Sequence, residues 1–303
     1  MRNYKKEYLQ NNKNKLLFII GLVLITLIMI LVCLFVGSSN MSIKECLEAL
    51  FLKSSEVNNR IIWKIRIPRI IAAVVAGAGL SISGLIMQTT LGNVMASPST
   101  LGVSNASVFG ANLSIIVFAG GFLSLGSNVN DYVISSTPFM TSLIAFIFAF
   151  ISILIVLILC KYKNYSPNSV VLAGIAIGAI WSAGTTILQF FATDVGLSAA
   201  VVWNFGDLGR ATYKIDLIMF CVVFISSILF YILSWYYNAL LGGDNIAKSI
   251  GVNVNYLRFI SLLLSSLITA VCVSFLGIIG FVGIIISTFL FLVSFSPSKF
   301  IIS

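Results

Sequence analysis

Residues 66–110 read RIPRIIAAVVAGAGLSISGLIMQTTLGNVMASPSTLGVSNASVFG, and this stretch decides the fold. An arginine pair flanks a proline, an apolar segment rich in small residues follows, and a polar break precedes a second segment rich in Gly, Ser and Ala. Between residues 70 and 160 the only charged residue is Asp131. A water-facing surface needs more charge, whereas membrane helices that approach closely need small residues. The stretch therefore predicts helices that pack tightly inside a membrane.

The composition of the whole chain indicates the same class of protein. Of the 303 residues, 59% are hydrophobic and 9% are charged, and the mean hydropathy is +1.08. Soluble domains contain about 25% charged residues, so we predict an all-α, polytopic transmembrane helix bundle. The net charge is +9, but the basic residues lie in short loops, which is typical of membrane topology and not of nucleic-acid binding.

The residue types that hold metals or perform catalysis are scarce. The sequence contains no histidine, and its five cysteines share no ligand spacing. Four of these cysteines lie in apolar runs, where we expect them to be small buried hydrophobic residues. We therefore predict a protein that is not an enzyme, with no catalytic residue, no metal ligand and no cofactor of its own.

Apolar runs of span length divide the chain. Residues 1–15 form a basic tail, and residues 16–36 form an apolar run longer than the core of a signal peptide. We interpret this run as an uncleaved first helix whose N-terminus is cytoplasmic, although Lys and Arg are divided almost equally between the two sides. The transmembrane domain is expected over residues 16–295, followed by an atypical tail at 296–303. Its spans, about eight in number, are predicted near 16–36, 70–90, 99–119, 139–160, 170–191, 214–236 and 258–295, the last being long enough for two crossings.

Two local patterns predict how helices pack. In the polar connection 40–64, an amphipathic segment places apolar residues at helical spacing: Ile43, Leu47, Leu50 and Phe51. In other segments small residues recur every four positions, as in Ala73/Gly77/Ser81, Ala76/Leu80/Gly84 and Gly174/Gly178. Such stripes let helices approach closely in lipid, so they indicate a helix bundle.

Three amide side chains lie near the ends of apolar runs: Gln88, Asn93 and Gln189. In an apolar setting an amide needs a hydrogen-bond partner or water. Two interpretations stay open at this point, a hydrogen bond between helices and a position on the wall of a polar pathway.

Residues 241–258, LGGDNIAKSIGVNVNYLR, form a well-delimited polar insert between two apolar runs. Asp244 suits an N-cap and Gly251 suits the residue that follows a helix, so a short helix of about six residues is predicted between them. Ile246, Ala247 and Ile250 share one face of it. A helix this short is marginal alone. The insert is either an ordinary capped loop or an exposed docking element for a cytoplasmic partner.

The sequence also bears on the source of energy. It contains no G-x-x-x-x-G-K-[ST] motif, so it cannot hold ATP by a P-loop. Acidic residues are almost absent from the predicted spans, whereas a proton-coupled transporter would usually keep one at mid-membrane. A pump of this kind would draw its energy from another chain, and a secondary transporter that works alone is the alternative.

Several motifs occur together and in a fixed order: RIPR at 66–69, GAGLSISGLIMQ at 77–88, the N-x-x-A-x-P-x-x-LGVS run at 93–104, a W-x-x-G element at 203–206, GD-x-x-A-x-x-x-GV at 243–252 and FLGIIGFVGIII at 275–286. With them the chain resembles the permease subunits of ABC importers for iron–siderophores, haem and vitamin B12. The resemblance implies a multi-pass protein of the bacterial cell membrane, built in the family from about ten helices. It also implies four kinds of partner besides membrane lipid: a second permease, identical or not, two cytoplasmic ATPases that hold ATP and Mg²⁺, and an extracytoplasmic substrate-binding protein.

The resemblance also implies roles for particular residues. Arg66 and Arg69 would contact acidic residues of the binding protein. The coupling segment that receives motion from the ATPase would comprise Gly243, Asp244, Ile246, Ala247, Ile250 and Gly251. The wall of the translocation pathway would comprise Gln88, Asn93, Pro98, Gly102 and Ser104. We therefore expect uptake of an iron–siderophore or related iron chelate by alternating access, with haem or vitamin B12 as alternative cargo.

Two departures from the family pattern stand out. The family's Asn-Pro-Leu-Ala-x-Pro element is Asn-Val-Met-Ala-Ser-Pro here (93–98), which keeps only the second proline. After Gly283 the family continues with a Pro-His turn, a basic segment and two further helices, whereas residues 284–303 read IIISTFLFLVSFSPSKFIIS. We therefore expect a truncated or frameshifted chain, and an inactive remnant is a further alternative.

Overall fold

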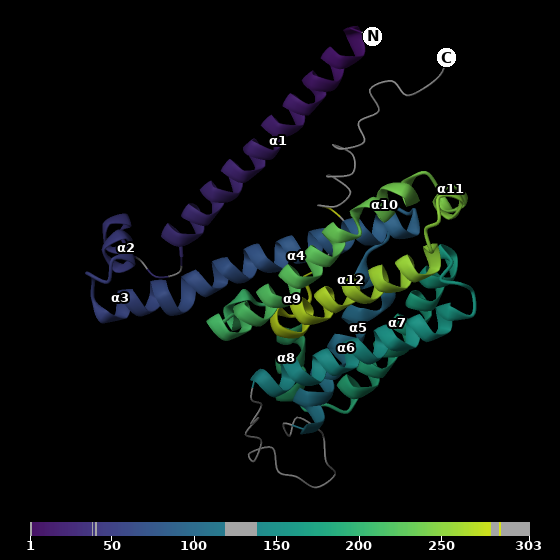
Figure 1. Ribbon diagram of the computed structural model, residues 1–303. Helices are drawn as coiled ribbons and strands as arrows, with labels where there is room; N and C mark the ends of the chain where they lie inside the picture. The colour runs from purple at the N-terminus through teal and green to yellow at the C-terminus, as the bar shows by residue number, and fades with distance from the viewer. Residues whose placement is uncertain (1, 38, 40, 119–137, 280–284, 286–303) are drawn as a thin grey trace. The chain divides into compact units, whose positions relative to one another are not determined.

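The computed structural model describes residues 2–37, 39, 41–118, 138–279 and 285 (Figure 1). The described residues belong to two compact units, one that extends to Ile71 and one that begins at Ala72. The expected tail at 296–303 and the expected second crossing after residue 279 lie outside the described residues, as does most of the segment 284–303 on which the expectation of a truncated or frameshifted chain rests.

The first unit contains four helical segments. They are α1 (Arg2–Phe35), α2 (Ile43–Leu50), α3 (Glu56–Arg60) and the π-helical turn η1 (Ile61–Arg66). Ser42 begins α2 with a capping box, because its hydroxyl accepts from the N–H of Glu45 and the Glu45 carboxylate accepts from the N–H of Ser42. The predicted amphipathic helix is therefore present.

The buried face of α2 differs from the predicted one. Cys46 and Ala49 are buried against Ile62, whereas Ile43 and Leu47 are 65% and 44% exposed. The helical spacing predicted the helix correctly. Its buried contact, however, is formed by the small residues Cys46 and Ala49, because η1 comes close to α2.

The long helix α4 (Ile67–Leu91) leads into the second unit. The α-helices that follow are α5 (Val103–Asn112), α6 (Pro138–Lys161), α7 (Pro167–Phe190), α8 (Asp194–Asn204), α9 (Tyr213–Ile232), α10 (Ser234–Leu241), α11 (Asp244–Ser249) and α12 (Val254–Leu276). Three short turns complete the described part, the 3₁₀ turns η2 (Pro98–Leu101) and η5 (Leu208–Arg210) and the π-helical turn η3 (Leu113–Phe118).

The fold is the predicted polytopic helical bundle. Six described helical segments are long and apolar enough to cross a membrane: Leu16–Phe35, Glu56–Leu91, Pro138–Lys161, Pro167–Phe190, Tyr213–Ile232 and Val254–Leu276. The span predicted near 99–119 begins later than predicted, and residues 119–137 lie outside the described part of the chain. Its described helical part is Val103–Phe118, because Ser97 and Pro98 start a separate 3₁₀ turn and Gly102 takes φ +75°.

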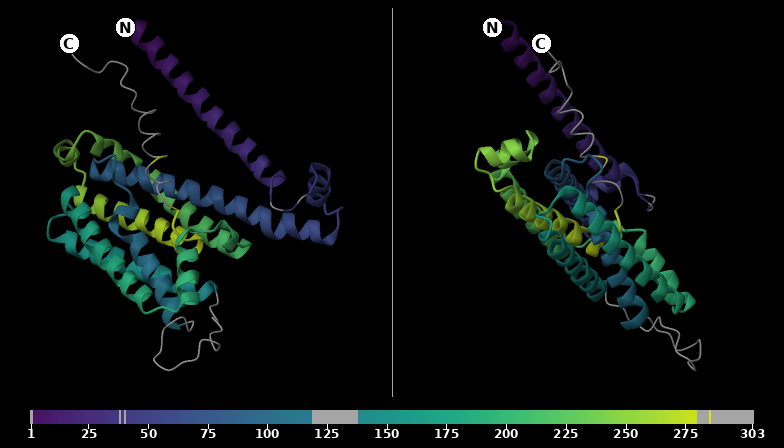
Figure 2. Two further views of the ribbon diagram at one scale, coloured as in Figure 1. Left: turned by 180° about the vertical axis from the view of Figure 1, so that it is seen from behind. Right: turned by 90° about the vertical axis from the view of Figure 1, so that its right-hand side faces the viewer.

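Helix α12 runs through the middle of the second unit, with α4 and α9 on one side and α5, α6 and α7 on the other (Figures 1 and 2). Its buried positions include many small hydroxyl residues: Ser261, Ser265, Ser266, Thr269 and Ser274. Small residues let membrane helices approach on several sides at once. This central position brings α12 into contact with α4, α5, α6 and α9.

Helix α4 uses one of its two predicted small-residue stripes inside the unit. Ala76 and Leu80 are buried, and a Cβ placed on Gly79 would lie 2.6 Å from Val223 of α9 and 3.0 Å from Ile268 of α12. The other stripe stays open, since a Cβ on Gly77 would meet no described atom within 4 Å. Packing within the described chain therefore accounts for one stripe and leaves the other available to a partner.

Candidate functional site

The short helix α11 lies at one end of the second unit, next to α10 (Figure 1). Its N-terminal boundary is Gly243, whose φ of +101° favours glycine. At the other end the N–H of Gly251 donates to the carbonyl of Lys248 and the N–H of Val252 donates to that of Ala247, both at 3.0 Å. This is a Schellman motif with Gly251 at φ +88°, which confirms the predicted end of the helix.

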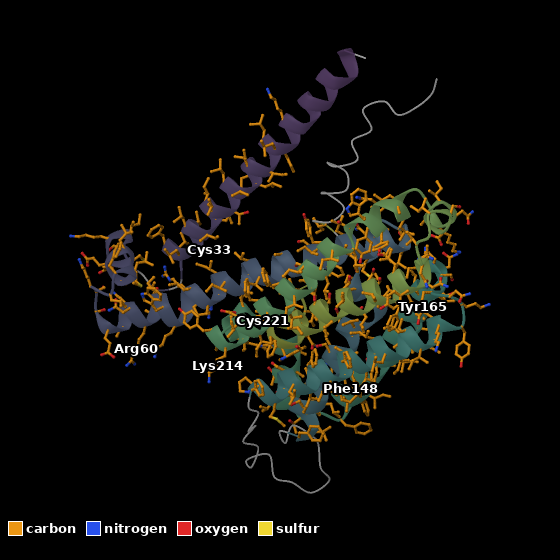
Figure 3. All side chains as sticks on the ribbon, in the orientation of Figure 1. Cys33, Arg60, Phe148, Tyr165, Lys214 and Cys221 are labelled. Atoms are coloured by element: carbon orange, nitrogen blue, oxygen red, sulfur yellow. The ribbon has the colours of Figure 1, made fainter. Side chains whose placement is uncertain are left out.

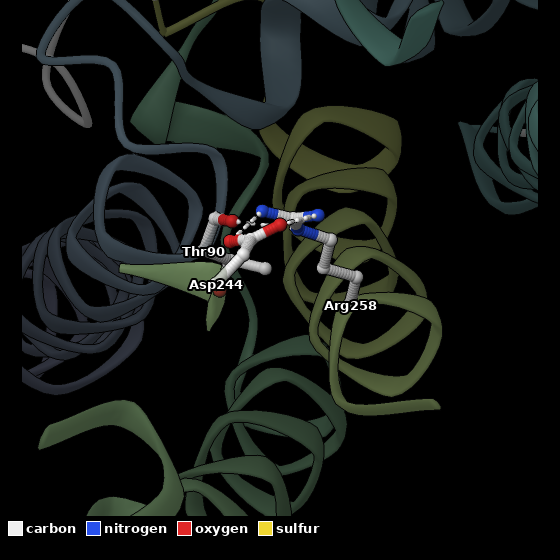
Figure 4. Close-up of polar contacts among 3 residues, drawn as sticks. All are labelled: Thr90, Asp244 and Arg258. Carbon is white, nitrogen blue, oxygen red and sulfur yellow. Dashed lines mark hydrogen bonds and ion pairs between the residues drawn. The ribbon is translucent and has the colours of Figure 1, made fainter. Parts of the chain in front are cut away.

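The prediction that Asp244 is the N-cap is wrong. Gly243 holds the cap position, and Asp244 is the first helical residue and caps no N–H. Its carboxylate instead accepts two hydrogen bonds from Arg258, Nη1 to Oδ2 at 2.9 Å and Nη2 to Oδ1 at 2.8 Å (Figure 4). Fork-shaped pairs of this kind are among the strongest polar contacts in proteins.

Arg258 also binds the end of a third helix. Its Nε donates to the carbonyl of Thr90 at 3.1 Å, and the residue is only 5% exposed. The Thr90 carbonyl belongs to the last turn of α4, where carbonyls lack partners within the helix and a positive charge is favourable. One guanidinium thus ties α11 to α12 and to the C-terminal end of α4. We call Asp244, Arg258 and the Thr90 carbonyl the arginine clamp.

The surface of α11 divides into a buried side and an exposed side. Ala247 is fully buried and packs in the core cluster that contains Leu240 and Val252. Ile246 and Ile250, predicted to share its face, are 57% and 64% exposed. Besides the arginine clamp, the helix therefore contacts the bundle through the buried Ala247, and it presents two large apolar side chains outward.

The predicted pathway residues fall into two groups. Gln88 is buried and its Nε2 donates to the carbonyl of Val94 at 2.6 Å, which fixes the loop after α4. Pro98 and Ser104 are also buried, in η2 and at the start of α5. Asn93, in contrast, is exposed on that loop and its Oδ1 accepts from the N–H of Met95.

Asn93 and Gly102 line a cavity of about 490 Å³ between the loop before α5 and helix α7. Gly174 and Gly178 form its α7 side. The contact is close, because a Cβ on Gly174 would lie 2.5 Å from the Thr100 carbonyl oxygen. The predicted Gly174/Gly178 stripe therefore packs against the 3₁₀ turn η2 and the start of α5, where Asn105 Nδ2 donates to the Gly178 carbonyl at 3.1 Å. The third amide, Gln189, donates to Asn112 Oδ1 at 3.0 Å, which is a hydrogen bond between helices.

The two arginines of the predicted docking pair, Arg66 and Arg69, differ in exposure to solvent. Arg66 is 7% exposed, and its guanidinium donates to the Leu34 carbonyl and, at 2.6 Å, to Ser39 Oγ. Arg69, one turn later, is exposed. Arg66 therefore organises its own unit, and Arg69 is the member of the pair that solvent or a partner can reach.

Sequence reasoning missed Arg258 as a site residue. It lies 14 positions after Asp244, and no local spacing rule links residues at that separation. The available signal was an arginine in the second turn of an apolar span, since a charge there needs a partner. Among the described residues no group of three or more His, Cys, Asp or Glu side chains could hold a metal ion.

Comparison with known proteins assigns the chain to a family. The profile of the FecCD transport family matches residues 25–302. A protein of Methanocaldococcus jannaschii, assigned by name to the ABC transporter permeases, is 39% identical over 280 residues, 92% of this chain and 79% of that protein. A Helicobacter pylori protein, assigned by name to an iron chelatin transport system, is 33% identical over 86% of this chain and 76% of its own length.

A solved structure gives the same result. It is described as an inward-facing conformation of a metal-chelate type ABC transporter, and it matches with a TM-score of 0.71 and 28% identity over 90% of this chain and 79% of its own. Other matching proteins are named for molybdate, vitamin B12 and hemin import. This multi-pass helical membrane protein therefore belongs to the FecCD transport family of ABC importer permeases.

Proposed function

We propose that this chain is the permease subunit of an importer that takes up an iron–siderophore or a related iron chelate. The cargo would cross by alternating access, and ATP hydrolysis on a separate chain would drive the change. The permease would alternate between states that bind its partners with different affinities. The observation that best supports this role is the geometry of α11, a short exposed helix anchored to two long helices by the arginine clamp.

In this proposal α11 is the coupling element. Ile246 and Ile250 would enter an apolar groove of the ATPase, because both are exposed and adjacent on the helix. Displacement of α11 would then reach α12 and α4 through Arg258, since an isolated six-residue helix has little stability of its own. Gly243 and Gly251 would set the ends of the element, and Ala247 would keep it seated on the bundle.

On the other side of the membrane we propose that Arg69 contacts acidic residues of an extracytoplasmic binding protein. Arg66 would contribute by holding the segment that presents Arg69, because its own guanidinium is occupied inside the unit. Rim charges of this kind govern association rates and salt dependence more than final affinity.

We further propose that the segment from Gln88 to Ser104 forms part of the pathway wall. Asn93 and Gly102 would face the pathway, and Gln88, Pro98 and Ser104 would support the loop from behind. The complete importer would comprise a second permease, two ATPases and one binding protein in a bacterial cell membrane. Haem or vitamin B12 is the alternative cargo. Membership of the FecCD transport family argues against a secondary transporter that works alone.

The test is co-purification of this chain with a candidate ATPase subunit that is co-expressed with it. Ile246→Glu combined with Ile250→Glu should abolish co-purification and ATPase stimulation, because two charges would have to enter an apolar contact. Tyr162→Glu, an 87% exposed residue in the loop after α6, is the matched control and should leave both unchanged. Full co-purification of the double variant would refute the coupling role of α11.

A further inference from the structure

A second, larger cavity lies at the end of the second unit opposite α11. It has a volume of about 750 Å³ and is lined by residues of η3, α6, α8, η5, α9 and α12. Lys214 lies at the first turn of α9 and Tyr165 lies near the α11 end of the bundle, and Figure 3 shows the two at opposite ends. Because α9 spans 20 residues, the cavity and α11 are separated by about 30 Å of helix.

Arg210 is the central feature of this cavity. Its guanidinium lies over the ring of Trp203, 5.4 Å from the centroid. Nη1 is enclosed and has no hydrogen-bond partner among the described residues, and Nη2 reaches the Val202 carbonyl at 3.5 Å, the limit for a hydrogen bond. Burial lowers the pKa of Arg210 and Asp207 raises it, but an arginine stays charged in either case. The cavity therefore contains a charged fork with unused donors.

The rest of the lining fits an anion. Lys214 adds a second positive charge, and Thr141 and Ser142 add hydroxyl groups from α6. None of the described lining residues is acidic. Two acids lie close to the lining in sequence. Asp216 follows the lining residue Ile215 but is buried and is not itself among the described lining residues, and Asp207 uses its Oδ1 to accept from the N–H of Gly209 at 2.6 Å.

We propose that this cavity binds carboxylate groups of a small anionic metal chelate on the side from which the importer takes up its cargo. The proposal rests on the proposed function and narrows the cargo to chelates that carry negative charge. Three observations support it. The volume lies within the usual range for small-molecule sites, the fork of Arg210 matches a carboxylate, and the cavity opens opposite the proposed ATPase contact.

The test measures ligand binding to the purified full chain by calorimetry, in detergent and in phosphatidylcholine nanodiscs. The probes are citrate, ferric citrate with excess citrate, and an uncharged ferric trihydroxamate. We expect saturable binding of the two citrate ligands, and binding of the uncharged chelate at least tenfold weaker. Arg210→Gln should weaken citrate binding at least tenfold, and Arg210→Lys, which keeps the charge but loses the fork, should have an intermediate effect. Lys161→Gln, at the opposite end of the bundle, is the control and should have no effect.

Several results would overturn the proposal. One is citrate binding by Arg210→Gln that is as strong as binding by the unaltered chain, with the variant eluting as a single species. Another is absence of citrate binding in both environments. Loss of citrate binding when phosphatidylglycerol is added would assign the cavity to lipid headgroup phosphates. Loss of binding-protein docking in Arg210→Gln, with citrate binding intact, would assign it to a protein contact. The assay needs no ATPase, so its outcome is independent of the co-purification test of α11.

Discussion

The arginine clamp allows a quantitative prediction, because its contacts differ sharply in burial from those of an ordinary surface ion pair. Replacing Asp244 with Ala removes both hydrogen bonds to Nη1 and Nη2. Among the described residues, the 5% exposed guanidinium then keeps the Thr90 carbonyl as its partner. Removing one member of a fully buried pair costs about 3–5 kcal/mol. The Asp244 side chain is 40% exposed, so water can partly replace it, and we expect a loss of about 2–3 kcal/mol.

A double-mutant cycle isolates the pair from other effects of each change. Asp244→Ala, Arg258→Ala and the double variant are unfolded in mixed micelles by increasing amounts of SDS, and the free energies of unfolding are compared. We expect an interaction energy of about 1–3 kcal/mol between the two side chains. The exposed pair Glu56–Arg60, whose side chains are 79% and 66% accessible at 2.6 Å separation, is the matched control and should give about 0.3–0.5 kcal/mol.

The functional consequence is measured in parallel. In Asp244→Ala we expect α11 to detach from α12 and α4, so ATPase co-purification should weaken even though Ile246 and Ile250 are unchanged. Additive single effects, with an interaction energy no larger than that of Glu56–Arg60, would refute the structural reasoning. A large interaction energy, together with normal ATPase association and stimulation in Asp244→Ala, would support the clamp as a structural contact but refute its role in coupling.

Two further predictions concern other parts of the chain. Gly174→Ala should destabilise the protein by about 1–3 kcal/mol in the same SDS titration, because its Cβ would lie 2.5 Å from the Thr100 carbonyl oxygen. Gly77→Ala, whose Cβ would meet no described atom within 4 Å, should change the stability little. Equal effects of the two substitutions would contradict the packing described for α7. Arg69→Glu should slow association with the binding protein in a salt-dependent way without loss of stability. Arg66→Met should lower the stability of the protein, because it removes the contacts to the Leu34 carbonyl and Ser39. An Arg66→Met variant of unchanged stability would show that these contacts contribute little.

The candidate site could be predicted in outline from the sequence. Gly251 marked the end of α11 correctly, because a residue at φ +88° after a helix is almost always glycine and this preference is local. Asp244 was assigned the wrong role, because an aspartate before a helix fits both an N-cap and a long-range ion pair. Arg258 decides between the two, and its position depends on how α12 packs.

The same division holds for the bundle. Apolar runs located the membrane helices, because crossing a bilayer requires a minimum length of apolar chain whatever its neighbours are. They did not predict that the helix of the span near 99–119 would begin only at Val103, because that follows from the turn at Pro98 and from the close approach of α7.

The sequence by itself thus determined the class of protein, the family and most of the membrane helices, because these depend on composition, motif order and local backbone preference. Only the tertiary structure decided that Arg66 is enclosed, that Ile246 and Ile250 are exposed while Ala247 is buried, and that Arg258 joins three helices. It also brought Arg210 and Lys214 into one cavity with residues of α6 and α12. The physical reason is that burial and pairing of charged side chains depend on atoms far apart in the chain, which meet only when the helices pack.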